Sequence, residues 1–173
     1  MKIKIIVLLG IMLPFLGTYA QEKLAQNTII GVLNGNQSQV VQLAEAFPED
    51  KYDWRPADGV YSVREALLHV AGANYFLMTK MGFAPPEDVD MMNLSAITGK
   101  ENVIRALKAS NAFILEKIPL IEDSKLSEEV DFGFMKINTM GGLLAVMEHN
   151  GEHKGQLIAY ARTNGIAPPW SLQ

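Results

Sequence analysis

The sequence has no cysteine among its 173 residues, and this absence excludes several kinds of chemistry. Without thiols the chain forms no disulfide, offers no thiolate to a metal ion and has no cysteine nucleophile of its own. It also lacks a glycine-rich phosphate-binding loop and a Gly-x-Ser-x-Gly motif. Stability must therefore come from burial of an apolar core, and any catalysis must use other side chains.

Long hydrophobic runs are also scarce. The run from Ile5 to Leu16 has about 12 residues, whereas a helix that spans a bilayer needs about 20. It follows two lysines and leads into small residues, a pattern typical of a secretory signal peptide cleaved between Ala20 and Gln21. We therefore expect residues 1–20 to be a signal peptide and the protein to be exported, periplasmic or secreted, with no stable membrane insertion after cleavage. An uncleaved membrane anchor is the alternative.

The chain after this segment has no excess of positive charge. Residues 21–173 carry 13 basic and 19 acidic side chains, a net charge of −6. Such a surface disfavours phosphate backbones and anionic lipid, so we expect no nucleic-acid partner. The length suits one domain with a proper core.

Helical periodicity is present in four segments, and no alternation of period two indicates a large sheet. The predicted helices cover residues 22–46, 62–81, 100–121 and 139–164. The connections between them are long, and residues 130–134 could form a short strand or an extended flap. This pattern predicts an all-α fold, a single four-helix bundle with long loops.

The three histidines are arranged as a metal ion would require. His149 and His153 are four residues apart, so they share one face of a helix. His69 lies in a different predicted helix and could supply a third nitrogen across a helix–helix contact. Three neutral imidazoles with an open fourth position form the first coordination shell of several catalytic zinc sites. The spacing therefore predicts a divalent-metal site, although structural histidines remain the alternative.

The face of the helix around His69 also has room for a ligand. Gly72 and Ala73 are small, and Phe76 and Glu65 complete the same face. A pocket needs missing side-chain volume as well as ligands, and this face supplies it. Glu65 could also hold the second nitrogen of His69, although its capping of the helix competes with that role.

Three residues are candidates for a general base by position alone: Glu65, Glu152 and Tyr160. Gln156 is one turn from His153, and its amide could orient a metal ligand. No catalytic residue is assigned from these patterns.

Two known metal-site patterns fit poorly. Residues 149–153 match His-x-x-Glu-His, but a helical wheel directs Glu152 about 80° away from the histidines, and few residues follow for the acidic ligand which that site needs. A di-iron bundle needs glutamate three residues before histidine, whereas Glu65 stands four before His69.

Four stretches together resemble the DinB-like superfamily, in their order and spacing: residues 52–56, 62–71, 149–157 and 165–169. This resemblance implies an up-down-down-up bundle with a divalent metal, zinc or nickel, bound by His69, His149 and His153. It also implies a homodimer. Characterised relatives include thiol-S-transferases, a mycothiol-dependent isomerase and proteins described as metal-dependent hydrolases.

The expected function is thus that of an exported divalent-metal-binding protein. We expect a metal-dependent hydrolase or thiol-S-transferase that acts on a small molecule through the three histidines. The alternatives are a non-catalytic metal or ligand binding protein and a helical interaction domain.

Overall fold

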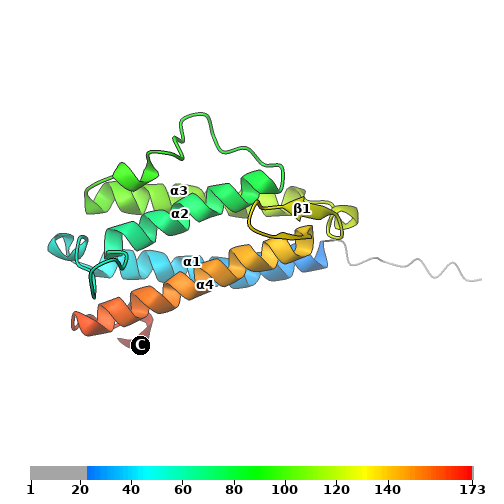
Figure 1. Ribbon diagram of the computed structural model, residues 1–173. Coiled ribbons are helices and arrows are strands. Elements are labelled where there is room, and N and C mark those ends of the chain that lie inside the picture. The colour runs from blue at the N-terminus through cyan, green and yellow to red at the C-terminus, as the bar shows by residue number, and fades with distance from the viewer. Residues whose placement is uncertain (1–22, 173) are drawn as a thin grey trace, which may run out of the picture.

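The structure, a computed structural model, describes residues 23–172, and four α-helices dominate it (Figure 1). The helices are α1 (Leu24–Ala46), α2 (Val63–Lys80), α3 (Lys100–Lys117) and α4 (Thr139–Thr163). Helices α1 and α4 run in one direction, and α2 and α3 run in the opposite one. The all-α fold class and the up-down-down-up bundle are therefore confirmed. The expected signal peptide lies outside the described residues.

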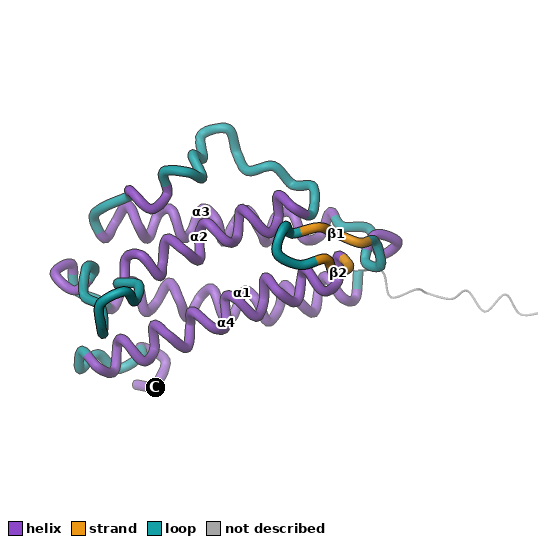
Figure 2. Tube along the Cα trace, viewed as in Figure 1, coloured by secondary structure: helices purple, strands orange, loops and turns teal. Residues whose placement is uncertain are grey.

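The long connection between α2 and α3 determines which helices are neighbours. It returns along the length of the bundle, so α2 and α3 are parallel and pack side by side (Figure 2). Helix α1 packs against α4, and α2 also contacts α4. The loops contain short 3-10 turns at Glu49–Lys51, Leu94–Ala96, Ile118–Leu120, Asp123–Lys125 and Pro169–Leu172. None of the helices in residues 23–172 is both long and apolar enough to cross a membrane.

Helix α2 begins and ends at local signals in the sequence. The hydroxyl of Ser62 accepts a hydrogen bond from the Glu65 amide at 3.2 Å, and the Glu65 carboxylate accepts one from the Ser62 amide at 2.8 Å. This capping box satisfies two free donors of the first turn. At the other end Gly82 has φ = +95°, a conformation that glycine adopts without strain.

Helix α3 is shorter than the sequence pattern suggests, and its predicted end at Ile121 is wrong. The helix ends at Lys117, and Ile118–Leu120 forms a 3-10 turn that contains Pro119. Proline has no amide hydrogen and its ring clashes with the preceding turn of an α-helix. The apolar spacing continues past this point, which is why periodicity alone overestimates the length.

A β-hairpin precedes α4, in the segment for which the sequence allows a short strand or an extended flap. Strand β1 (Glu129–Asp131) pairs antiparallel with β2 (Lys136–Asn138). Phe132, only 1% exposed, anchors the turn in the core. It lies against Gly142 of α4, where an added Cβ would be 2.7 Å from the ring. The glycine is therefore required for the hairpin to dock.

A buried polar network joins α2, α3 and α4. The amide nitrogen of Asn74 donates to Ser110 and to Asn111, both at 3.1 Å. Its oxygen accepts a hydrogen bond from Asn150 at 2.9 Å. Asn150 also donates to the carbonyl oxygen of Val146 at 3.0 Å. Because buried amides are costly without partners, this network fixes how α2 sits against α4.

We expect Asn74→Ala to destabilise the bundle by about 3 kcal/mol, because it leaves buried groups on α3 and α4 without partners. The measurement is the free energy of unfolding in urea. Asn102→Ala, at an exposed position of α3, is the control and should change it by less than about 0.5 kcal/mol. Equal effects of the two substitutions would contradict the role of the network.

Candidate metal centre

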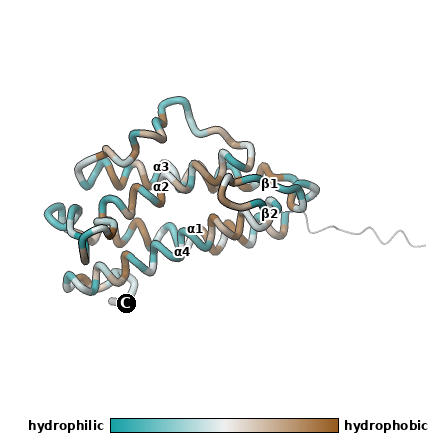
Figure 3. The backbone as a smooth tube through the Cα atoms, viewed as in Figure 1, coloured by the Kyte–Doolittle hydropathy of each residue, from teal (hydrophilic) through white to brown (hydrophobic). Residues whose placement is uncertain are grey.

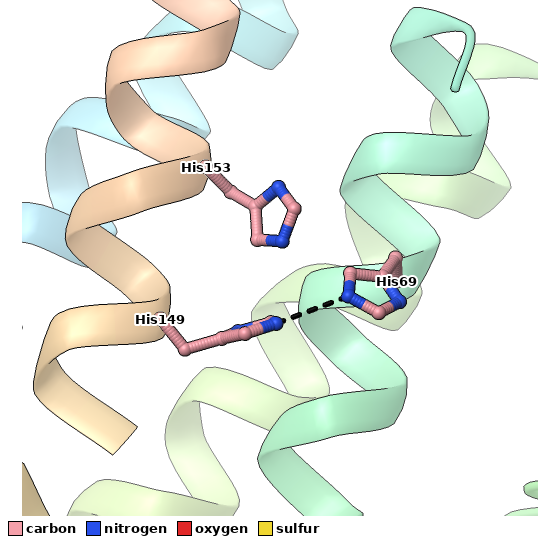
Figure 4. Close-up of side chains that lie close together, drawn as sticks. All are labelled: His69, His149 and His153. Carbon is pink, nitrogen blue, oxygen red and sulfur yellow. Dashed lines mark hydrogen bonds between the residues drawn. The ribbon is translucent and has the colours of Figure 1, made fainter. Parts of the chain in front are cut away.

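The structure brings all three histidines together between α2 and α4 (Figure 4). His69 projects from α2, and His149 and His153 project from successive turns of α4. Their ring centroids are 4.5 to 4.9 Å apart. One nitrogen from each ring can be chosen so that all three lie within 4.8 Å of one another. The cluster therefore could hold a metal ion.

Two of the ring nitrogens lie close enough to share a proton or a cation. Nε2 of His149 lies 3.0 Å from Nε2 of His69. Two lone pairs repel at that distance, so a proton or a cation must lie between them. Two nitrogens bound at about 2.1 Å to one tetrahedral cation are about 3.4 Å apart, so a bound cation would require the two rings to move apart slightly. The other nitrogen of His149, Nδ1, is buried without a hydrogen-bond partner among the described residues, whichever species lies between the two Nε2 atoms.

The surroundings keep two of the rings neutral. Burial lowers the pKa of His149 to about 4, and the neighbouring His153 and His69 contribute to the shift. Burial also lowers the pKa of His69, with His153 adding to the effect and the carboxylate of Glu152 opposing it. Neutral imidazole has the free lone pair that a metal ion requires.

A chain of hydrogen bonds orients the third ring. Tyr160 donates to the carbonyl oxygen of Tyr61 at 2.9 Å, so its own oxygen is free to accept from the Gln156 amide nitrogen at 2.7 Å. The Gln156 oxygen then faces Nδ1 of His153 at 2.7 Å, and this nitrogen must donate. Nδ1 of His153 therefore carries a proton, so Nε2 is the nitrogen of this ring that can serve as a ligand. This is the arrangement of outer-shell partners in metal sites.

The three candidate bases are placed very differently. Glu65 caps α2 and pairs with Arg55 at 3.1 Å, and its capping bond to Ser62, more than Arg55, lowers its pKa. Glu152 is exposed on the outer face of α4. Tyr160 already donates its proton. Glu65 and Tyr160 are therefore engaged, whereas Glu152 is exposed and its charge still acts on His69.

A cavity of about 680 Å³ opens beside His69 and His149. The predicted pocket residues Glu65, Gly72, Ala73 and Phe76 all line it. Sequence reasoning missed the residues that loops and the hairpin contribute, among them Arg55, Tyr61, Met91, Leu94 and Phe134. No local signal marks these residues, because the cavity forms only when separate loops pack over α2.

The comparison with protein families agrees with the fold. The profile of the DinB family matches residues 23–171. The chain belongs to the DinB family.

Named relatives come from Bacillus. The chain is similar to uncharacterized protein YjoA of Bacillus subtilis (strain 168), at 27% identity over 151 residues, with 80% of this chain and 90% of YjoA covered. Two crystal structures share the fold. One is a DinB-like protein from Bacillus cereus ATCC 10987, with a TM-score of 0.72 at 14% identity over 83% of this chain and 95% of the other. The other is YjoA itself, with a TM-score of 0.64 at 23% identity over 80% and 92%.

The low pKa of His149 predicts a pH-dependent stability for protein treated with a chelator. Between about pH 6.5 and 4 the unfolded chain binds a proton at His149 that the folded chain does not, so the free energy of unfolding falls as the pH falls. From pH 7 to pH 4.5 the loss is on the order of 2 kcal/mol, reduced because solvent reaches part of the ring. Urea unfolding of wild type and His149→Gln measures it. His149→Gln should lack the part of the pH dependence that comes from His149. If the free energy of unfolding changed with pH in the same way in the two proteins, the assignment would be contradicted.

The orientation of His153 gives a second prediction. Gln156→Leu removes the acceptor for Nδ1–H and should weaken zinc binding about 10-fold, as measured by calorimetry. Arg162→Gln, at an exposed position in the last turn of the same helix, is the control and should bind zinc as wild type does. Unchanged affinity in Gln156→Leu would show that the hydrogen-bond chain does not support a metal ligand.

Proposed function

We propose that this DinB-family protein is a divalent-metal-dependent enzyme, with zinc or nickel at His69, His149 and His153, that acts on a small molecule as a hydrolase or a thiol-S-transferase. The observation that carries the proposal is the cavity of about 680 Å³ that opens on two of the three histidines. Its size suits a small-molecule ligand. Export through residues 1–20 and a homodimer stay predictions of the sequence.

The donor set fits a catalytic ion. Three neutral imidazoles leave the full charge of a divalent cation in place and one coordination position open. A bound cation would supply Lewis acidity to an oxygen or sulfur atom of the small molecule. Because the chain has no cysteine, any thiol in the reaction must belong to a cosubstrate.

The residues of the chain provide position and shielding. Gln156 holds the proton of His153 away from the ligand nitrogen. Apolar side chains from α2 and the loop around Leu94 line most of the cavity and restrict water. The Arg55–Glu65 pair provides the polar part of the wall.

A non-catalytic binding protein is the second candidate, and one observation favours it. Glu65 is paired and Tyr160 already donates its proton, so neither is free to move a proton at the cluster, and Glu152 is exposed to solvent. A carrier needs no such group. An enzyme could instead rely on the ion and the cosubstrate.

Metal content tests the site that both candidates require. Purified wild type is incubated with zinc or nickel and then desalted. It should retain about one ion per chain, as measured by elemental mass spectrometry. His69→Ala, His149→Ala and His153→Ala should each retain far less. Arg162→Gln should retain as much as wild type. Equal metal in wild type and the histidine variants would exclude the site.

Activity separates the enzyme from the carrier. Aryl esters test hydrolysis, and an aryl halide with a low-molecular-weight thiol tests transfer. We expect turnover by the metal-loaded protein to fall at least 100-fold with chelator or with His149→Ala, and to return when metal is restored to wild type. Full metal occupancy without turnover of either class would favour the carrier.

A further inference from the structure

A large aromatic side chain is displayed on the surface beside the histidine cavity. Phe134, in the turn between β1 and β2, is 69% exposed although it lines the cavity. Figure 3 shows the hairpin turn as a hydrophobic segment that faces the helices. The ring of Phe134 lies at 23° to that of Phe76 on α2, with centroids 6.4 Å apart. Exposed apolar surface at the edge of a pocket indicates ligand contact.

The hairpin holds Phe134 in a fixed place. Phe132, two residues earlier, is buried against Gly142 of α4. Gly133 between them has φ = +91°, and its amide donates to the carboxylate of Asp131 at 2.8 Å. The turn therefore directs Phe132 into the core and Phe134 toward the cavity. Phe134 packs beside Phe132, with ring centroids 6.3 Å apart, yet most of its surface stays exposed at the cavity.

The cavity has different chemistry at its two ends along α2. Glu65, with its partner Arg55, lies one turn before His69. Phe76 lies seven residues after His69, about 10 Å further along the helix axis. Phe134 joins Phe76 at this second end, so the apolar end lies about 10 Å along the axis of α2 from His69, and the charged end is on the other side of that histidine.

We propose that Phe76 and Phe134 form an aromatic subsite that selects substrates carrying an aromatic or bulky apolar group about 10 Å from the reacting atom. The inference rests on the proposed function for the position of the reacting atom. It adds the substrate class: a molecule with a reactive oxygen or sulfur at the histidines and a flat apolar group between α2 and the hairpin. Aromatic rings pack on one another with centroids about 4.5 to 7 Å apart, which this end of the cavity allows.

Binding of non-reactive probes tests the subsite without reference to turnover. Three probes are used with zinc-loaded protein: acetohydroxamate, a naphthyl hydroxamate whose alkyl linker spans about 10 Å, and the matching naphthyl alcohol, which lacks the metal-binding group. Affinities are measured by calorimetry in wild type, Phe134→Ala and Phe134→Tyr. Leu120→Ala, an exposed apolar residue outside this cavity, is the control.

We expect Phe134→Ala to weaken binding of both naphthyl probes about 5-fold or more, and to leave acetohydroxamate within about 2-fold of wild type. Phe134→Tyr, which keeps the ring, should bind all three as wild type does, and so should Leu120→Ala. Because Phe134 is exposed, none of these changes should alter the melting temperature appreciably.

The outcomes distinguish the two proposals. If acetohydroxamate binds but Phe134→Ala leaves the naphthyl probes unaffected, the subsite is wrong and the metal site stands. If acetohydroxamate fails to bind but the naphthyl alcohol loses affinity in Phe134→Ala, the open metal position is wrong and the subsite stands. An equal loss for all three probes would also overturn the subsite, since it would indicate a general change in the cavity.

Discussion

One buried hydrogen bond, from Asn150 of α4 to Asn74 of α2, holds together the two helices that carry the site. Asn150 directly follows His149 in the chain, and Asn74 is little more than one turn beyond His69. This buried pair tolerates little sliding, because a small shift would leave the Asn74 oxygen without its hydrogen-bond donor in a low dielectric. An uncharged hydrogen-bond network between α2 and α4 thus fixes the relative position of the imidazoles that the two helices carry.

The histidine cluster depends on the protonation of its rings as well as on their positions. The same burial that places Nε2 of His149 3.0 Å from His69 also lowers the pKa values of both rings, so they do not repel each other as cations at neutral pH. His153 is oriented by another route: its Nδ1 donates to Gln156, and Gln156 in turn donates to Tyr160. The three rings therefore present nitrogen lone pairs to one small volume that has no acidic ligand. A divalent ion binds such a set of donors.

Much of this arrangement was visible in the sequence, and the exceptions have a common cause. Spacing along one helix indicated that His149 and His153 share a face, and the Ser62 capping box gave the start of α2, because both are local features. The end of α3 was misjudged because the apolar pattern continues past Pro119. The Asn74 network, the Arg55–Glu65 pair and Phe134 depend on contacts between segments distant in sequence, which no local pattern encodes.

The central claim is that His69, His149 and His153 bind one divalent cation together. X-ray absorption spectroscopy of the zinc-loaded protein tests it most directly, because it counts imidazole ligands and measures their distances. The account predicts three imidazole nitrogens at about 2.0 to 2.1 Å with one further light atom, and two imidazoles in His69→Ala. A wild-type spectrum with fewer than three imidazoles, or one unchanged by His69→Ala, would contradict it.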